Sequence, residues 1–381
     1  MDVKHICFVA EGYPTDDDPR FTFVRQLICS IADLGVQCSV IVPQSITNTL
    51  KRSKGKRPYH WTDSHNSRIN IFQPKYISFS NIKIFGVNLS HLLWRRAVIK
   101  TYKKLNINPD ILYGHFWHCG VVASMIGQEN NLPVFVASGE SRVTVQELYK
   151  ETKLRRILTQ VKGVICVSSK NKKESIDLNL TTENQIQVIP NAIDNSKFYL
   201  EDKLKARRKL GFQENDFIVA FTGAFNNRKG VLRLSEAVQT LKDVKSVYIG
   251  SGELIPKGEG ILFCGKLPHD QIVHYLNAAD VFVLPTLAEG CCNAIIEAMA
   301  CGLPIVSSDQ SFNDDILNEQ NSIRIDSNDI DKIADAVRYL KDNPQIKEEM
   351  SLASLSMAKG LDIQTRAKNV IHFIEKQLGG I

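Results

Sequence analysis

Two carboxylates, Glu289 and Glu297, stand eight residues apart in a stretch that could bind a polar ligand. The apolar run Val281–Thr286 precedes them and Ile305–Ser308 follows, so the pattern predicts a buried strand, a turn, a short helix and a second strand. Asn293 is the predicted N-cap of the helix, because its side-chain oxygen can accept a first-turn amide. The two acids would then flank the amino end of a helix, where free N–H groups and the helix dipole favour an anion.

The surroundings of Glu297 bear on what these acids do. From spacing alone both acids could be solvated, as most helix carboxylates are. Glu297, however, follows Ala294-Ile-Ile and precedes Ala298-Met-Ala, and a carboxylate among apolar residues needs a partner or a ligand. Gly302 and Pro304 are expected to end the helix, because glycine tolerates a left-handed turn and proline cannot continue a helix.

A pair of cations, Arg228 and Lys229, follows the predicted strand Phe217–Thr222 and precedes a predicted helix. Gly223 and Gly230 flank the pair and permit a tight turn. Two adjacent cations at the amino end of a helix suit a diphosphate, although solvated surface cations give the same pattern. The segment is not a P-loop, because the sequence contains no Gly-x-x-x-x-Gly-Lys-Ser/Thr.

The first half of the chain also places polar residues after predicted strands. His115 follows a strand predicted to end at Tyr113, and His118 is an alternative to it. Glu140 ends the next predicted strand, and Gly12, after the first strand, would let the backbone approach a ligand. A packed or surface histidine is the simpler interpretation until the whole chain is considered.

The order of the predicted elements indicates the scaffold. Strand-like and helix-like segments alternate in both halves, which predicts parallel sheets with helices on both faces. Ligands of such sheets gather at the carboxyl ends of the strands. We therefore expect an α/β fold of two doubly wound, Rossmann-like domains facing across a cleft, one over 1–195 and one over 196–363. The predicted strands are 6–10, 37–42, 69–72, 110–113, 133–137, 163–168, 217–222, 246–250, 261–264, 281–286 and 305–308. The predicted helices are 21–34, 90–105, 120–128, 144–160, 202–210, one ending at 241, 269–278, 329–341, 344–359 and 364–378; a turn is predicted at 250–252.

The composition is that of an ordinary globular chain. Its 381 residues suffice for about two domains. No stretch approaches the roughly 18 uncharged apolar residues of a membrane span, and Met1–Ala10 lacks the order of parts of a signal peptide. Nine cysteines without a Cys-x-x-Cys pair predict reduced thiols in a cytoplasmic protein, with neither a disulfide framework nor a zinc site.

The net charge of +6 is unevenly placed. Lys51–Arg57 carries five positive charges in seven residues. A predicted helix beginning near His91 carries five more, on Arg95, Arg96, Lys100, Lys103 and Lys104. A solvated loop and helix face would explain this pattern. The alternative is attraction to anionic lipid or to a phosphate-bearing acceptor, with peripheral contact at the inner face of a membrane. No nucleic-acid-binding motif accompanies the charge, so nucleic acid is not expected.

The order of these motifs resembles the large family of retaining glycosyltransferases that have two Rossmann-like domains, the GT-B fold, family 4. The resemblance covers nearly the whole chain and is strongest over about 217–310. The matching features, in order, are Pro190-Asn-Ala-Ile-Asp194 (Pro-Asn-Gly-Val/Ile-Asp in the family), Arg228-Lys229-Gly230 (its Lys-Gly phosphate site), Gly250-Ser-Gly252 (its Gly-x-Gly turn) and Glu289 to Glu297 (its Glu-x7-Glu motif).

The resemblance implies roles for the matched positions. Glu297 should bind the donor's ribose hydroxyls, and Glu289 should lie beside the hydroxyls of the transferred sugar. Arg228 and Lys229 should stabilise charge on the departing diphosphate without a metal ion or other cofactor, and His115 should lie near the sugar's 6-hydroxyl. The implied catalytic residues are His115, Glu289, Arg228 and Lys229. The implied donor-binding residues are Gly12, Gly223, Arg228, Lys229, Gly265, Lys266, Leu267, Glu289, Gly290, Cys291, Cys292, Asn293, Ala294 and Glu297.

Several positions depart from the family pattern. Ala224 stands where many members carry Arg, so phosphate binding rests on Arg228 and Lys229. Cys291-Cys292 replaces a frequent Phe-Gly, which is expected to alter the sugar pocket, and Ala192 replaces a glycine in the linker. The glycine-rich element after the first strand keeps Gly12 but has Phe21 or Asp18-Pro19 in place of its later glycine.

The resemblance implies an enzyme of class EC 2.4. It would move a hexose-type sugar, with retention, from a UDP- or GDP-sugar to a hydroxyl of a glycan or lipid-linked acceptor in surface polysaccharide biosynthesis. The first domain would bind the acceptor, the second the nucleotide sugar, and the last helix, 364–381, would pack back on the first. One alternative is a sugar-nucleotide epimerase of the same architecture, which would release product without an acceptor. Another is a non-catalytic sugar-nucleotide-binding subunit, against which the retained carboxylates and paired cations argue.

Overall fold

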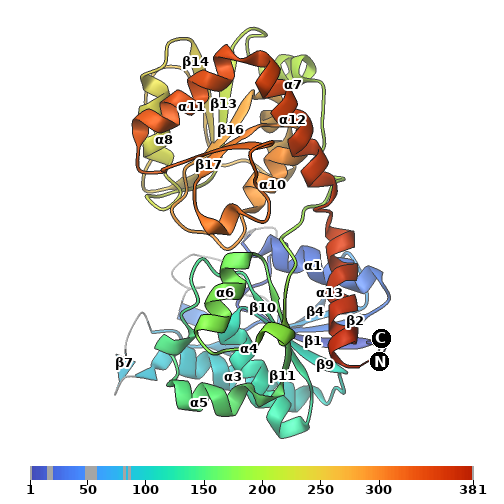
Figure 1. Ribbon diagram of the computed structural model, residues 1–381. Helices are drawn as coiled ribbons and strands as arrows, with labels where there is room; N and C mark the ends of the chain where they lie inside the picture. The colour runs from blue at the N-terminus through green and yellow to red at the C-terminus, as the bar shows by residue number, and fades with distance from the viewer. Residues whose placement is uncertain (1, 15–19, 48–57, 80–82, 85–86, 380–381) are drawn as a thin grey trace. The chain divides into compact units, whose positions relative to one another are not determined.

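The protein is described by a computed structural model that covers residues 2–14, 20–47, 58–79, 83–84 and 87–379 (Figure 1). Lys51–Arg57 and Asp18-Pro19 lie outside the described residues. The chain divides into two compact units: unit 1 is Met1–Ile189 with Gln364–Ile381, and unit 2 is Pro190–Ile363. The division falls before Pro190 and not after residue 195, because Ile193 forms a β-bridge with Asp362 of unit 2.

Unit 1 is built on one sheet with the strand order β12-β11-β10-β9-β1-β2-β5-β4. Neighbouring strands are parallel, except that β4 is antiparallel to β5. The central strands β1, β9 and β10 are mostly apolar, and apart from the half-buried His5 all their residues are buried, as expected when helices cover both faces. The strands are β1 (His5–Val9), β2 (Gln37–Ile41), β4 (His60–Thr62), β5 (Ile69–Phe72), β9 (Ile111–His115), β10 (Val134–Ser138), β11 (Val161–Cys166) and β12 (Ile186–Val188); β3 (Gln44–Ser45) pairs with β6 (Lys75–Tyr76), and β7 (Lys83–Ile84) with β8 (Val87–Asn88).

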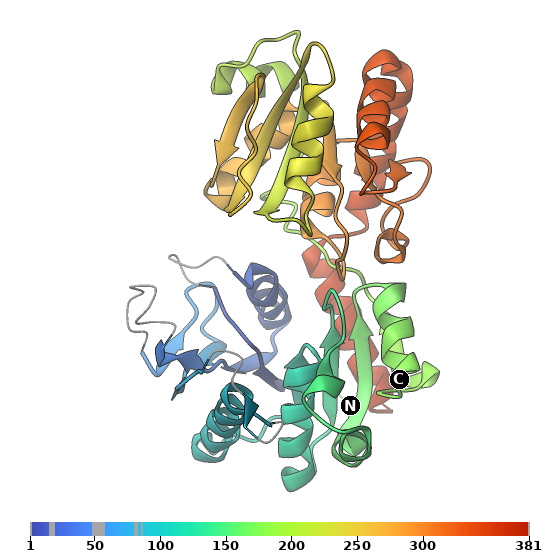
Figure 2. The same cartoon turned by 90° about the vertical axis from the view of Figure 1, so that its left-hand side faces the viewer.

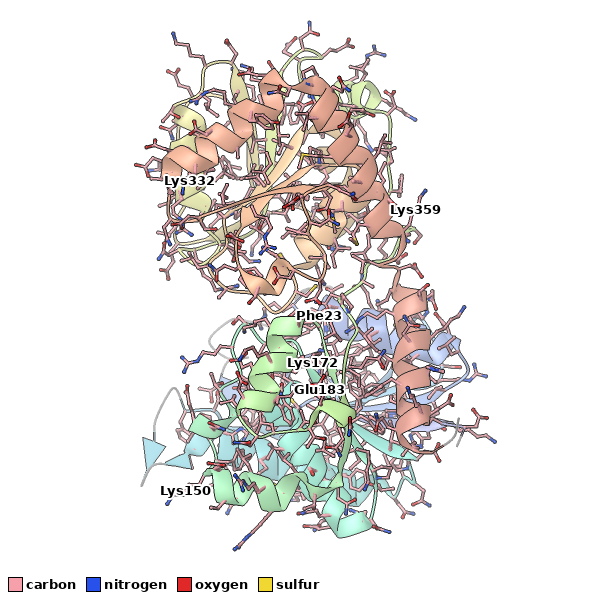
Figure 3. All side chains as sticks on the ribbon, viewed as in Figure 1. Phe23, Lys150, Lys172, Glu183, Lys332 and Lys359 are labelled. Atoms are coloured by element: carbon pink, nitrogen blue, oxygen red, sulfur yellow. The ribbon has the colours of Figure 1, made fainter. Side chains whose placement is uncertain are left out.

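Helices cover both faces of this sheet (Figure 1). One face carries α1 (Thr22–Asp33) and α13 (Ile363–Gln377), and the other carries α3 (Leu89–Leu105), α4 (Trp117–Asn130), α5 (Glu151–Ile157) and α6 (Ser169–Asp177). On the first face, the Phe373 ring of α13 packs edge-on against Phe135 of β10, with centroids 6.4 Å apart. On the second, Lys172 of α6 forms an ion pair with Glu183, and Figure 3 shows these two side chains together.

Unit 2 contains a second sheet, with the order β15-β14-β13-β16-β17-β18 and all neighbours parallel (Figure 2). Its strands are β13 (Phe217–Phe225), β14 (Val244–Gly252), β15 (Ile261–Gly265), β16 (Val281–Leu284), β17 (Ile305–Ser308) and β18 (Ser322–Ile325). Helices α8 (Val231–Gln239) and α11 (Ile330–Asp342) lie side by side on one face (Figure 1). The remaining helices are α7 (Lys203–Leu210), α9 (Ile272–Ala278), α10 (Asn293–Ala300) and α12 (Pro344–Lys359); α7 packs on α9, and α10 on α12.

The structure corrects several predicted elements. The predicted helix 144–160 is a 3-10 turn (Val145–Glu147), the short helix α5 and a second 3-10 turn (Leu158–Gln160). Helix α6 lacks an apolar periodicity, and β12 and β18 are short, so the sequence pattern does not predict them.

The segment Gly250-Ser-Gly252 is the end of strand β14 and not a turn. It pairs with Gly223–Phe225 of β13. A Cβ atom on Gly250 would lie 1.8 Å from the Gly223 carbonyl oxygen, so the glycines serve the close approach of two strands.

Candidate functional site

Arg228, Lys229 and Glu289 follow the two strands, β13 and β16, between which the strand order of the unit 2 sheet reverses. From β13 the chain builds outward through β14 and β15 on one side, and from β16 through β17 and β18 on the other. Arg228 and Lys229 follow β13, and Glu289 follows β16. Loops at such a switch point diverge and leave room for a ligand at the carboxyl ends of the strands.

Glu289 collects three donors on one carboxylate oxygen. Its Oε1 lies 2.6 Å from an Arg228 guanidinium nitrogen and 2.7 Å from Lys229 Nζ, and it accepts a hydrogen bond of 2.9 Å from the Thr286 hydroxyl. The side chains of Glu289 and Lys229 are 13% and 11% exposed, whereas that of Arg228 is 40% exposed. Lys229 is thus a largely buried cation, and Arg228 is the more accessible of the two.

Backbone contacts hold the two loops together. The amide of Leu287 donates to the Arg228 carbonyl at 2.8 Å, and the Arg228 side chain also donates to the Ala288 carbonyl at 2.5 Å. Gly230, the N-cap of α8, adopts φ 76°, and a Cβ there would lie 2.4 Å from the Pro285 carbonyl oxygen. Only glycine fits this position, which brings the start of α8 against the loop that carries Glu289.

Cys292 is the N-cap of α10, so the prediction that Asn293 fills this position is wrong. Lys229 Nζ lies 3.6 Å from Cys292 Sγ. Burial would lower the pKa of Lys229, but the Cys292 sulfur and the Glu289 carboxylate outweigh it, so the pKa of Lys229 is raised. Burial raises the pKa of the Cys292 thiol, although Lys229 opposes this. The Oδ1 atom of Asn293 is buried and has no hydrogen-bond partner among the described residues.

Glu297 lies in α10 and is 8% exposed. Its Oε1 is 3.2 Å from His269 Nε2, and the His269 ring packs edge-on against Phe198, with centroids 5.0 Å apart. Glu297 therefore has the partner that a buried carboxylate needs. The structure does not join it to Glu289 by a direct contact.

The other donor-binding candidates of unit 2 lie at or after the carboxyl ends of its strands and at the start of α10. Gly290 and Cys291 are buried, and the Cys291 carbonyl accepts a hydrogen bond of 3.1 Å from Asn191 of the linker motif. Asn293 and Ala294 open α10 and are half-buried. Gly223 faces Gly250 inside the sheet. Gly265, Lys266 and Leu267 lie at the end of β15, with Lys266 exposed.

In unit 1, Gly12 and His115 flank the corresponding switch point, between β1 and β9. His115 is the last residue of β9, not a residue beyond it, and is 7% exposed. Its ring contacts those of Phe23 and Phe116, at centroid distances of 5.5 and 4.9 Å. Burial, with smaller contributions from Arg366 and His118, lowers the pKa of His115 to about 3, so His115 is neutral at pH 7.

The structure adds to the expectations for Gly12 and Glu140 in unit 1. The Phe21 ring packs onto Gly12, where an added Cβ would lie 2.1 Å from the ring, so the missing side chain makes room for Phe21. Glu140 accepts hydrogen bonds from the amides of Trp117 (2.5 Å) and Gly139 (2.9 Å). The Glu140 carboxylate therefore caps the amino end of α4, a structural role that its position after a strand does not reveal.

The sequence patterns miss two contributors. Thr286 and His269 each contact one of the paired acids, yet neither belongs to a recognisable motif. The only signal is positional, since each follows a strand at the carboxyl edge of the sheet. Within the described ranges, no group of three or more His, Cys, Asp and Glu side chains is placed to hold a metal ion.

Two family descriptions match the chain in succession. Residues 21–197 match Glycosyltransferase Family 4, and residues 216–343 match Glycosyl transferases group 1. Over 351 residues the chain is 26% identical to a candidate teichuronic acid biosynthesis glycosyltransferase, TuaC, of Bacillus subtilis (strain 168), covering 88% of both chains. It is 25% identical over 316 residues to a UDP-Gal:alpha-D-GlcNAc-diphosphoundecaprenol alpha-1,3-galactosyltransferase of Escherichia coli, covering 74% of this chain and 80% of that one.

Solved structures share the fold. The sucrose-phosphate synthase of Thermosynechococcus elongatus superposes with a TM-score of 0.79 at 18% identity, covering 99% of this chain and 100% of that one. HepE of Anabaena, solved in complex with UDP, gives 0.73 at 17% identity, covering 98% and 100%.

The chain belongs to the group 1, family 4 glycosyltransferases and has their GT-B fold. It is a transferase of class EC 2.4, as the recognised motif order predicts. No helix in the described part of the chain is both long and apolar enough to cross a membrane.

Proposed function

We propose that this glycosyltransferase moves a hexose-type sugar from a UDP- or GDP-sugar to a hydroxyl of a glycan or lipid-linked acceptor, with retention at the anomeric carbon. Assembly of a surface polysaccharide is the proposed setting. The support comes from the relatives, one of which is named for teichuronic acid biosynthesis and another for transfer to a diphosphoundecaprenol-linked sugar. The HepE structure with UDP supports a nucleotide diphosphate as the leaving group.

The observation that carries the proposal is the meeting of Arg228, Lys229 and Glu289 at the switch point of unit 2. A departing diphosphate develops negative charge, and fixed cations in a partly desolvated site stabilise it without reorganisation. Lys229 keeps its proton, because its pKa is raised. Glu289 holds the two cations in place and keeps a second oxygen for a sugar hydroxyl, so it acts as an orienting group and not as the nucleophile.

We further propose that retention follows from attack of the acceptor hydroxyl on the face that the diphosphate leaves. The leaving phosphate then helps to take the acceptor's proton, and no metal is required. Glu297, held by His269, binds the ribose hydroxyls. His115, neutral at pH 7, is suited to hydrogen-bond a sugar hydroxyl without adding charge. The proposed location is the cytoplasm, with peripheral contact at an anionic membrane through the basic unit 1.

The first experiment identifies the donor. The melting temperature of the full chain is measured with UDP-, GDP- and ADP-sugars, because a ligand that binds only the folded state raises it. Transfer is then measured with the stabilising donor and a pool of lipid-linked acceptors, with and without EDTA. Full activity in EDTA is expected; its loss would contradict a metal-independent reaction.

The second experiment tests the site. Lys229→Ala, Glu289→Gln and Glu297→Ala should each reduce turnover, Lys229→Ala by about 10²–10³ if it stabilises the developing charge. The matched control is Glu236→Gln, an exposed carboxylate on α8. Wild-type turnover in all three site variants would refute the assignment. Release of an altered free sugar nucleotide from donor alone would instead indicate the epimerase.

A further inference from the structure

A cavity of about 360 Å³ opens in unit 1 between α3 and the segment that follows β5. This size falls within the range of small-molecule sites. None of its lining residues is a catalytic or donor-binding candidate. They are Tyr59, Gln73, Pro74, Lys75, Ala97, Lys100, Thr101 and Lys104, and we call the cavity the α3 pocket.

The charge of the α3 pocket is of one sign. Its lining contains three ammonium groups, of Lys75, Lys100 and Lys104, and no carboxylate. In the described part of the chain these three lysines form no ion pair, whereas Lys103 of the same helix lies 2.7 Å from Glu129. Lys100 and Lys104 are also four residues apart on α3, a spacing at which like charges destabilise a helix. An anion bound between them would relieve that repulsion.

Neutral hydrogen-bond donors complete the lining. Gln73 is 1% exposed, and its Oε1 accepts a hydrogen bond of 3.0 Å from Trp61 Nε1. That bond fixes the orientation of the side-chain amide and leaves its N–H groups as donors, whereas the main-chain N–H of Gln73 donates to the Tyr59 carbonyl at 2.7 Å. Thr101 and Tyr59 add two hydroxyl groups, and the Tyr59 ring and Pro74 add apolar surface.

We infer that the α3 pocket binds a phosphate group carried by a small organic moiety. A phosphate oxyanion accepts hydrogen bonds from several directions at once, which matches three ammonium groups and neutral donors around one cavity. The moiety is either a soluble phosphate ester or the headgroup of a phosphate-bearing lipid. This inference stands on the lining of unit 1 and does not depend on the proposed transfer reaction.

The test compares two double variants of the full chain that remove the same charge. The pocket variant is Lys100→Gln with Lys104→Gln. The control is Lys103→Gln with Lys150→Gln, which neutralises an ion-paired lysine of α3 and an exposed lysine before α5 (Figure 3). Both variants keep Arg228, Lys229 and the cations of 51–57, so binding through those groups is common to them.

Two probes distinguish a soluble phosphate ester from a lipid headgroup as the ligand of the α3 pocket. Binding of glycerol 3-phosphate is measured by calorimetry, and binding to phosphatidic acid vesicles by co-sedimentation against phosphatidylcholine vesicles, both at about 0.15 M salt. The pocket variant should bind at least one probe about tenfold more weakly than the control. A loss confined to the soluble probe identifies a soluble ester, and a loss with the vesicles identifies a lipid headgroup. Equal binding by the two variants, or no binding of either probe by the wild type, would overturn the inference.

Discussion

Replacing Glu289 with glutamine should destabilise unit 2 through Lys229. The carboxylate is 13% exposed and lies 2.7 Å from Lys229 Nζ, which is itself 11% exposed. Glutamine keeps the size of the side chain but removes its charge, so the lysine is left buried beside the Cys292 sulfur. Removing one partner of a buried ion pair costs about 3–5 kcal/mol. Because Arg228 is exposed enough to turn to water, we expect the lower end, about 3 kcal/mol.

A second substitution tests the cause of this loss. Glu289→Gln combined with Lys229→Met removes both buried charges and should recover most of the stability, because the remaining cation, Arg228, is 40% exposed and can turn to water. The free energy of unfolding is measured by urea titration of the full chain, in which the transition of unit 1 is an internal control. A loss below about 1 kcal/mol for Glu289→Gln, or a double variant that merely sums the single losses, would refute the reasoning.

The ion pair of Glu289 and Lys229 also predicts that the folded state loses stability at alkaline pH. The pKa of Lys229 is raised above its ordinary value of 10.5. Burial alone would lower this pKa, but the Cys292 sulfur and the Glu289 carboxylate outweigh burial. A raised pKa of a lysine stabilises the folded state fully below the unfolded value, and this stability is lost as pH rises through the folded value. In Glu289→Gln the alkaline loss should move to lower pH.

Three further predictions concern acid stability, a helix cap and strand packing. The pKa of His115, lowered to about 3, lies below that of the unfolded chain, so acidification below pH 6.5 should destabilise unit 1. His115→Asn should flatten the pH dependence of its urea unfolding by about 1.4 kcal/mol per pH unit, and an unchanged slope would argue against burial as the cause. Glu140→Ala should cost about 1–2 kcal/mol and increase hydrogen exchange at the start of α4, where it caps the Trp117 amide; unaltered exchange would show that the cap is dispensable. Gly250→Ala places a Cβ 1.8 Å from a carbonyl oxygen, whereas at Gly265 the nearest atom is 3.6 Å away. The first should lower the melting temperature of unit 2 strongly and the second little, so equal melting temperatures would contradict the close approach of β13 and β14.

The sequence predicts the scaffold well because strand burial leaves a strong pattern. Apolar runs such as Val281–Leu284 and Val134–Ala137 are recognisable alone, and their alternation with helices specifies parallel sheets. What the pattern loses is structure whose stability comes from distant partners. Helix α6 is polar, but Trp117 donates a hydrogen bond to its Ser175, and no local periodicity reports such a contact.

The sequence predicts which residues belong to the candidate site, but not which contacts they make with one another. Spacing places Glu289, Lys229 and Glu297 at one edge of a sheet, and the structure puts the first two in direct contact. The sequence does not show that Glu297 pairs with His269, because Glu297 lies in α10 and His269 lies in a 3-10 turn 28 residues earlier in the chain. Nor does it separate Glu140, whose carboxylate is occupied by backbone amides, from a carboxylate available to a ligand.

The chain passes from unit 1 into unit 2 before Pro190 and returns after Ile363. Unit 2 is therefore one uninterrupted stretch, whereas unit 1 needs α13, which covers one face of its sheet and buries Phe373 against Phe135. During synthesis, unit 2 can complete its fold as soon as it has emerged. The earlier part of unit 1 still exposes the part of its apolar sheet face that α13 covers, because α1 covers only the rest. Unit 1 thus begins to be synthesised before unit 2 but completes its fold after it. Chaperones that bind exposed apolar surface should therefore recognise nascent chains that end before residue 364.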